Sequence, residues 1–384
     1  MKSWLAQQEE KGRLRRLVPI SDRDGSRILL AGSPGQALVD FSSNDYLALA
    51  QHPTLIAAAQ RALAEYGTSA GAARLMSGDL SIHHELEEAV ALFKGKEAAL
   101  SFGSGYMANA GIIPALVGRH DVIFSDRLNH ASIHDGCRLA GARLVRFRHN
   151  DISHLESMLR EKRGTGSALV VVESVYSMDG DCCPLSDLVA LKKRHDFLLM
   201  VDEAHATGVF GRNGGGMIEE KEVGSGVDLA MGTFGKALGS YGAYVAASRE
   251  MIDFLLNRAR SFIFSTALPA PVAAASLAAV RLVQDDSGLR DELHGKMRYF
   301  KKCLRESGLG KDFGPSQIVP ILVGEGVAAL EAAALLREKG FFVTAVRPPT
   351  VPEGTSRLRF SVTLHQSETQ LKDAVAALAD VLNC

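Results

Sequence analysis

The sequence predicts an α/β protein in which a large domain, built on a mostly parallel seven-stranded sheet covered by helices, precedes a smaller α+β domain. Between about residues 95 and 250, short apolar runs alternate with helical stretches. This alternation is typical of parallel strands joined by right-handed crossovers. The runs are apolar at successive positions rather than at every second one, as in strands covered by helices on both faces. After about residue 285 the pattern changes, which marks the smaller domain.

Seven apolar runs account for the strands of the predicted large sheet. They are AALSF (98–102), DVIFS (121–125), ARLVRF (142–147), ALVVVE (168–173), FLLMVD (197–202), DLAMG (228–232) and AYVAAS (243–248). Each run is short enough for a strand and is followed by polar or glycine residues.

The C-terminal part of the chain predicts helices at 289–307 and 327–340 and strands at 317–324, 341–348 and 356–363. The last two strands carry polar residues on one face, so we expect a sheet with one side in water. The expected division is an N-terminal segment (1–45), a large domain (46–282) and a small domain (283–384).

Composition excludes several classes of protein. The 384 residues carry a formal net charge of −1, with 46% hydrophobic and 23% charged residues, as in an ordinary globular protein. This balance gives no electrostatic footprint for nucleic acid or an anionic membrane, and no apolar run is long enough to span a bilayer. The N-terminal residues lack the pattern of a secretory signal. The five cysteines are odd in number and contain no C-x-x-C, so we expect a reducing cytoplasm rather than disulfides or a zinc ribbon.

Polar residues gather after the predicted strands, where ligands of open α/β sheets bind. The segments that follow or end the apolar runs are GSGYMAN (103–109), DRLNHASIH (126–134), SVYSMDGD (174–181), DEAHATG (202–208) and TFGK (233–236). We therefore expect a site at the carboxyl edge of the sheet.

Two familiar interpretations of these segments fail. VDEAHA (201–206) matches a helicase motif, but such an enzyme also needs G-x-x-x-x-G-K-[ST], and no Gly-Lys pair of this chain precedes Ser or Thr. GSGYMA (103–108) departs from the dinucleotide pattern G-x-G-x-x-G at its last position.

His130 and His134 have a spacing that suits a metal on a helix, but this spacing is common by chance, so no metal site is expected.

Asp202 and Lys236 both follow apolar strands. A buried carboxylate is costly unless it is paired, although it can simply cap the next turn. A reactive lysine needs surroundings that make its neutral amine accessible. Pyridoxal phosphate (PLP) would satisfy both groups, because its aldehyde takes a lysine and its ring nitrogen takes a carboxylate. Its phosphate needs amides and hydroxyls, which GSGYMAN, Ser177 and Thr233 are placed to supply.

The order of the glycine-rich turn, NHAS, SMDGD, VDEAHATG and TFGKALG resembles that of the aspartate-aminotransferase-like PLP enzymes of fold type I. Within them the chain is similar to the α-oxoamine synthase family, which joins an amino acid to an acyl thioester with loss of carbon dioxide. The resemblance runs from FSSNDYLAL (41–49) to RLRFSVT (357–363).

The resemblance implies a role for each matching residue. It makes Lys236 the cofactor lysine, Asp202 the partner of the ring nitrogen, His205 the contact of the ring hydroxyl, and His130 the histidine stacked on the ring, which also meets substrate. It implies further cofactor contacts at Gly105, Tyr106, Ser177 and Thr233, with Thr266 supplied by the second subunit of a homodimer. For substrate it implies Arg359 at the carboxylate, with Asn44, Thr350 and Arg15 as further contacts.

Within the family, RPPTVPEGTSRLRF (347–360) is most similar to the member that uses L-alanine and a pimeloyl thioester, of coenzyme A or acyl carrier protein, in biotin biosynthesis. Three alternatives stay open: a glycine-using synthase of the 2-amino-3-ketobutyrate ligase or 5-aminolevulinate synthase type, a transaminase, and a non-catalytic relative. The last would be expected to lose Lys236 or Asp202, and both are present.

Overall fold

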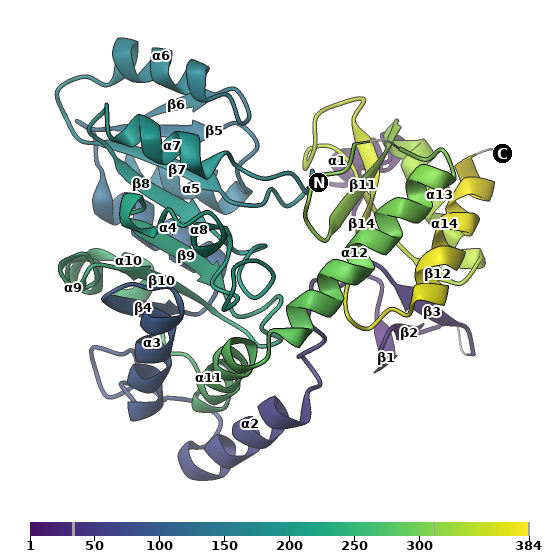
Figure 1. The fold of residues 1–384 in the computed structure, drawn as a ribbon, viewed down its shortest axis with the longest axis horizontal. Helices are drawn as coiled ribbons and strands as arrows, with labels where there is room; N and C mark the ends of the chain where they lie inside the picture. The colour runs from purple at the N-terminus through teal and green to yellow at the C-terminus, as the bar shows by residue number, and fades with distance from the viewer. Residues whose placement is uncertain (33–34, 311, 383–384) are drawn as a thin grey trace. The chain divides into compact units, whose positions relative to one another are not determined.

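The computed structural model describes residues 1–32, 35–310 and 312–382. Its contacts divide the chain into two compact units (Figure 1). The larger unit consists of Leu49–Tyr176 and Cys182–Arg290. The smaller unit consists of Met1–Ala48, Ser177–Asp181 and Asp291–Cys384.

The larger unit contains the predicted seven-stranded sheet. In spatial order its strands are β4 (Ala98–Phe102), β10 (Ala243–Ala247), β9 (Leu229–Thr233), β8 (Leu198–Asp202), β7 (Ala168–Glu173), β5 (Val122–Asp126) and β6 (Arg143–Phe147). The sheet is mostly parallel, as predicted, and β10 alone among them runs antiparallel to its two neighbours. Because β9 and β10 are antiparallel, a short loop joins them at the edge where the parallel strands end.

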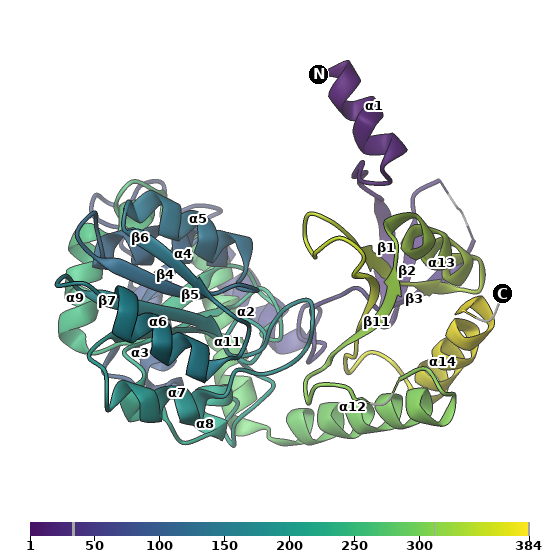
Figure 2. The ribbon, with the colours of Figure 1, turned by 90° about the horizontal axis from the view of Figure 1, so that it is seen from above.

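Helices cover both faces of this sheet, with α4 and α5 on one side and α6 and α7 on the other (Figure 2). The helices are α2 (Pro53–Tyr66), α3 (Ser81–Phe93), α4 (Gly105–Leu116), α5 (Ala131–Ala140), α6 (Ile152–Lys162), α7 (Leu185–Lys192), α8 (Met217–Glu220), α9 (Arg249–Arg258), α10 (Arg260–Ile263) and α11 (Ala270–Asp285), with a 3-10 turn at Gly224–Gly226. Apolar side chains of α4, α5 and α9 pack with those of the strands in one buried cluster. This packing explains why the strand runs are apolar at successive positions.

The smaller unit is α+β, as predicted. One sheet has the order β1 (Ile20–Asp24), β2 (Arg27–Leu30), β3 (Ala37–Asp40) and β12 (Phe341–Phe342), and a second has the order β11 (Ile318–Gly324), β14 (Ser356–Ser361) and β13 (Thr344–Val346). Its helices are α1 (Lys2–Glu10), α13 (Gly326–Glu338) and α14 (Glu368–Leu382), and α12 (Gly288–Glu306) leads into it from the larger unit. Because β3 pairs with β12, residues of the predicted N-terminal segment share a sheet with those of the predicted small domain.

The expectation of a sheet with one side in water is wrong for β14, where all six residues are buried. Its two arginine side chains find partners within the unit in the segment 177–181. Arg357 Nη1 donates to Asp179 Oδ1 at 2.6 Å, and Arg359 Nε donates to the Ser177 carbonyl at 2.7 Å. Burial is tolerated because these guanidinium groups find oxygen partners.

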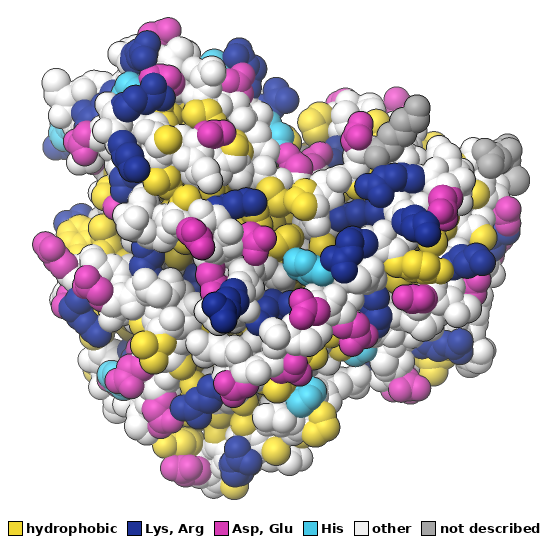
Figure 3. Space-filling model, viewed as in Figure 1, with side chains coloured by type: hydrophobic (Ala, Val, Ile, Leu, Met, Phe, Trp, Pro, Cys, Tyr) yellow, Lys and Arg dark blue, Asp and Glu magenta, His cyan; other side chains and the backbone are white. Residues whose placement is uncertain are grey.

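Charged side chains of both signs are interspersed on the face shown in Figure 3, which agrees with the near-zero net charge. Among the described residues, no helix has both the length and the apolar content to cross a bilayer. The four described cysteines, Cys137, Cys182, Cys183 and Cys303, are free thiols, and Cys384 lies outside the described residues.

Candidate active site

A pocket of about 220 Å³ lies at the carboxyl edge of the large sheet. It brings together seven of the predicted site residues: Gly105, Tyr106, His130, Asp202, His205, Thr233 and Lys236. Its lining also includes Asn109, Ser132, Glu173, Ala204 and Met231. All these residues belong to the larger unit.

Lys236 lies in the loop between β9 and β10. Thr233 shapes this loop, because its hydroxyl donates to the Gly242 carbonyl at 2.7 Å and accepts from the Gly235 amide at 3.1 Å. Gly239 has φ +60, and a Cβ there would clash with the backbone of Leu49 and Ala50, so the turn requires glycine. The loop places Lys236 Nζ 2.9 Å from His205 Nε2.

Asp202 ends β8 and is only 5% exposed. Its Oδ2 accepts from Asn109 Nδ2 at 3.0 Å, and its Oδ1 accepts from the Ala204 amide at 2.9 Å. In the described part of the chain this carboxylate has neutral donors and no ion pair. A buried carboxylate with only neutral partners favours a cationic ligand group beside it.

His130 is the N-cap residue of α5, where its Nδ1 accepts from the Ser132 amide at 3.2 Å. Its own amide donates to the carboxylate of Glu173, a buried residue at the end of β7. Burial lowers the pKa of His130, and the charge of Lys236 also lowers it, while Asp202 acts in the opposite sense. The ring is therefore held neutral near pH 7.

Gly105 and Tyr106 begin α4, which is capped by the Ser104 hydroxyl accepting from the Met107 amide at 3.2 Å. The free amides and positive dipole end of such a helix favour an anion in the pocket. Tyr106 is half exposed, and its hydroxyl donates to Asp135 Oδ2 at 2.6 Å.

The smaller unit brings Ser177, Asn44 and Arg359 together. Arg359 is 7% exposed, and besides the Ser177 carbonyl its guanidinium donates to Ser361 Oγ at 2.8 Å and Asn44 Oδ1 at 3.2 Å, with the Tyr46 hydroxyl at 3.5 Å. Two residues earlier on β14, Arg357 forms an ion pair with Asp179. Among the described residues Arg359 has no such anion, so its buried charge favours an anionic ligand.

Arg15 and Thr350, which are far apart in sequence, also meet within the smaller unit. Arg15 Nη2 donates to Thr350 Oγ1 at 2.9 Å. The neighbouring Arg13 forms an ion pair with Glu353, so the N-terminal segment contacts the 350–353 segment through two side chains.

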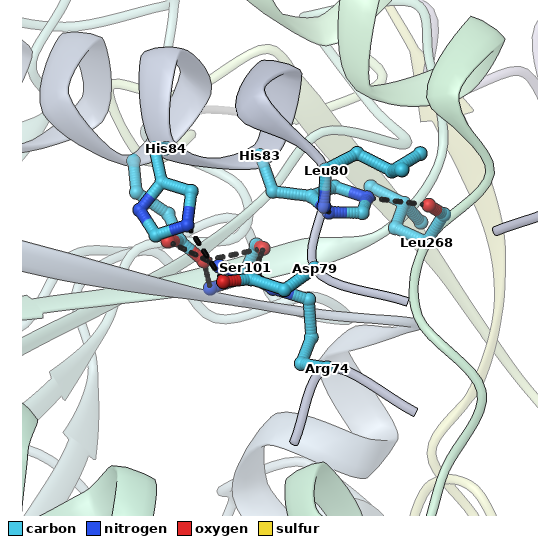
Figure 4. A network of polar contacts seen from close by, with 8 residues as sticks. Arg74, Asp79, Leu80, His83, His84, Ser101 and Leu268 are labelled. Atoms are coloured by element: carbon cyan, nitrogen blue, oxygen red, sulfur yellow. Dashed lines mark hydrogen bonds and ion pairs between the residues drawn. The ribbon is translucent and has the colours of Figure 1, made fainter. Parts of the chain in front are cut away.

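Thr266 does not line the Lys236 pocket of its own chain. It pairs with Ala73 in an isolated β-bridge and lines a separate small cavity with Arg74 and Ser101. Figure 4 shows the polar network beside it, in which Arg74 contacts Asp79 and Ser101, and His83 Nε2 lies 2.6 Å from the Leu268 carbonyl. Helix α3 thus holds the segment that carries Thr266.

His83 is completely buried, and its Nδ1 accepts from the Leu80 amide at 3.2 Å. Burial lowers its pKa below the ordinary value of 6.5. The unfolded chain therefore binds the proton more tightly, so this part of the stability is present above about pH 6.5 and is lost as the pH falls through the unfolded and then the folded pKa. We expect urea midpoints at about pH 8 and pH 5.5 to differ more for the native protein than for His83→Gln. An equal difference in both proteins would contradict this assignment.

Three polar pocket residues are not among the predicted site residues: Asn109, Ser132 and Glu173. Glu173 carries the same signal that indicated Asp202, a carboxylate at the end of an apolar strand. Asn109 is a buried amide among apolar residues of α4, and Ser132 directly follows His130. Neither of these two has a sequence pattern that separates it from ordinary helix residues.

Comparisons with known proteins agree with the fold. Residues 36–378 match the family model of class I and II aminotransferases. The 8-amino-7-oxononanoate synthase of Geobacter sulfurreducens is 52% identical over 379 residues, which cover 98% of this chain and 96% of the relative.

Two solved structures are similar over most of the chain. A serine palmitoyltransferase variant from S. paucimobilis with a bound PLP–myriocin adduct has a TM-score of 0.94 at 29% identity, covering 100% of this chain and 96% of that one. The 8-amino-7-oxononanoate synthase of Francisella tularensis has a TM-score of 0.77 at 28% identity, covering 90% and 98%. The expected fold of the type I PLP enzymes is thereby confirmed. The chain therefore belongs to the class I and II aminotransferase family and groups within it with the 8-amino-7-oxononanoate synthases.

Proposed function

We propose that this protein is a PLP-dependent acyltransferase that condenses L-alanine with a pimeloyl thioester, releasing 8-amino-7-oxononanoate, carbon dioxide and the free thiol, in biotin biosynthesis. The observation that carries the chemistry is a pocket that holds both Lys236 and the buried Asp202, a carboxylate that forms no ion pair with any described residue. The product follows from the relatives, which are about half identical to this chain over nearly its whole length and are named 8-amino-7-oxononanoate synthases. L-alanine and the pimeloyl thioester are the substrates that the resemblance of segment 347–360 implies.

The residues of the pocket fit PLP. The buried carboxylate of Asp202 suits a protonated ring nitrogen, His205 the ring hydroxyl, and His130 the ring face. The start of α4, with Gly105 and Tyr106, suits the phosphate, and we assign further phosphate contacts to Thr233, Ser177 and Thr266. When bound, PLP supplies an aldehyde that holds the amino acid and a ring that withdraws electrons from its α-carbon.

The chain's own residues then orient the amino acid and move its proton. Arg359 and Asn44 bind the α-carboxylate of alanine, and the guanidinium can do so in a bidentate pair. Lys236 Nζ removes the α-proton and later returns a proton to the same carbon. Between these steps the α-carbon attacks the thioester carbonyl, the thiol leaves, and the carboxylate is lost as carbon dioxide.

Arg15 and Thr350 are assigned to the acyl substrate. They already form one hydrogen-bonded pair, and a guanidinium suits the anionic end of a dicarboxylic acyl chain. Whether the carrier is coenzyme A or acyl carrier protein makes no difference to this contact, because the anionic end belongs to the acyl group.

We also propose a cytoplasmic homodimer in which Thr266 completes the site of the partner subunit. The shared site is supported by Thr266, which lies outside the Lys236 pocket of its own chain. The cytoplasmic location is supported by the described cysteines, which are free thiols. A fully active monomer in sedimentation experiments would contradict the shared site.

Direct competition tests the substrate assignment. With alanine and glycine at equal concentration, each offered with pimeloyl, acetyl and succinyl thioesters, we expect alanine and the pimeloyl donor to be preferred. Packing one methyl group in a pocket contributes about 1–3 kcal/mol of binding free energy, so alanine should be preferred over glycine by about 10- to 200-fold. Thiol release and carbon dioxide report turnover. A preference for glycine with a short donor would refute the biotin-pathway assignment and leave the PLP chemistry intact.

A further inference from the structure

A line of hydrogen bonds joins Asp202 to His130 across the pocket wall. Asn109, on α4, is 1% exposed, and its Nδ2 lies 3.0 Å from Asp202 Oδ2 and 3.0 Å from Ser132 Oγ. Ser132 Oγ in turn lies 2.8 Å from His130 Nδ1. The Ser132 amide lies 3.2 Å from the same nitrogen.

The chemistry of these groups fixes the direction of every bond. A backbone amide can only donate, so His130 Nδ1 must be an acceptor that carries no proton. The Ser132 hydroxyl therefore donates to Nδ1 and is left to accept from Asn109. An ionised Asp202 can only accept, so it also requires the amide NH₂ group of Asn109. One orientation of Asn109 meets both demands.

We propose that Asn109 and Ser132 are positioning residues that hold His130 as the neutral tautomer with its proton on Nε2 and link that tautomer to ionised Asp202. The positioning of His130 does not depend on the proposed function, but the role given below to the proton on Nε2 does. Nε2 has no hydrogen-bond partner in the described part of the chain, so it offers a donor to the pocket. Such a donor stabilises the oxygen of a thioester carbonyl as negative charge develops on it.

The arrangement orients groups and does not conduct protons. An amide nitrogen does not release a proton at neutral pH, so Asn109 cannot pass one between Asp202 and Ser132. The charged and titratable groups that act on His130 are Asp202, Lys236 and Asp135. None of these contributes a bond to Nδ1, so the tautomer depends on the amide and the hydroxyl of Ser132, and Asn109 orients the hydroxyl.

The test measures the tautomer directly. Holoenzyme labelled with ¹⁵N in its histidine rings is studied by NMR, and the His130 signal is assigned by its loss in His130→Asn. We expect the native protein to show a protonated Nε2 and a bare Nδ1. Ser132→Ala keeps the backbone amide donor and loses the hydroxyl, so the ratio of the Nδ1-H to the Nε2-H form should rise by about 5- to 10-fold, as expected for the loss of one hydrogen bond. In Asn109→Ala the hydroxyl stays but loses the donor that orients it, so the ratio should rise by a smaller factor.

Kinetics of the same variants separate positioning from binding. We expect kcat to fall by about 10- to 100-fold, as is typical when the partner that orients a functional histidine is lost, with the KM for alanine nearly unchanged. Ser132→Thr keeps a hydroxyl and should retain the native tautomer. Ser276→Ala is the matched control, because Ser276 is also fully buried but bonds to Ser240 and Val272; it should change neither measurement.

Three results would overturn the proposal. They are a native His130 protonated on Nδ1, variants that keep the native tautomer while kcat falls, and variants that change tautomer while kcat stays the same. If the tautomer behaves as expected but no condensation of alanine with a pimeloyl thioester is found, the proposed reaction fails and the positioning role stands. Ser132→Ala and Asn109→Ala test the proposal separately, so one of them that folds is enough to decide it.

Discussion

Lys236→Ala is expected to lower kcat/KM by about 10³-fold or more, because it removes both the attachment point of the cofactor and the base that moves the α-proton. The fold should survive. Lys236 is partly exposed in its loop, and the loop is closed by backbone bonds and by Thr233, none of which uses the lysine side chain. The variant should therefore elute and melt like the native protein while having almost no activity.

Borohydride reduction followed by mass mapping of peptides locates the lysine that carries PLP. We expect the reduced adduct on Lys236 of the native protein and no adduct in the variant. Lys339→Ala is a matched control, since Lys339 is an exposed lysine paired with Asp380. An adduct on another lysine, or near-native turnover by Lys236→Ala, would refute the assignment.

Most of the fold could be predicted because burial leaves a simple pattern in the sequence. The strands of the large sheet lie under helices on both faces, so their residues are apolar at successive positions and the runs stand out. The interpretation of β14 failed for the opposite reason. Arg357 and Arg359 have the spacing of residues on a solvent-exposed face. They are buried because segment 177–181, which is distant in sequence, supplies their hydrogen-bond partners.

The site could be predicted in part because charge is costly to bury. Asp202 and Lys236 stand out at the ends of apolar strands, and the structure places both in one pocket. Asn109 and Ser132 do not stand out, because a neutral amide or hydroxyl is common on a helix. They matter because of hydrogen bonds that join α4, α5 and β8. These elements are far apart in sequence, so the sequence pattern does not predict the bonds.

Asp202→Asn is expected to lower kcat by roughly 10²- to 10³-fold, because the cofactor's ring nitrogen loses the anion that keeps it protonated and electron-withdrawing. The fold should again survive, since asparagine keeps an oxygen that can accept from the Ala204 amide. The contact with Asn109 becomes unfavourable, because an NH₂ group at residue 202 would face the NH₂ group of Asn109 and both groups are donors. Asn109 can avoid this by turning its amide, since its own oxygen has no partner among the described residues. That oxygen would then accept from the Ser132 hydroxyl, which would no longer donate to His130 Nδ1.

The variant therefore separates two effects of Asp202. Exchange of the α-proton of alanine with solvent deuterium, measured without the acyl donor, reports proton removal alone and should fall with kcat. The ¹⁵N signal of His130 should move toward the other tautomer only if Asn109 turns. Asp151→Asn, at the partly exposed N-cap of α6, makes the same chemical change outside the pocket and should alter neither measurement. Near-native proton exchange in Asp202→Asn would show that this carboxylate is structural, since a weakened electron sink cannot leave proton removal unchanged.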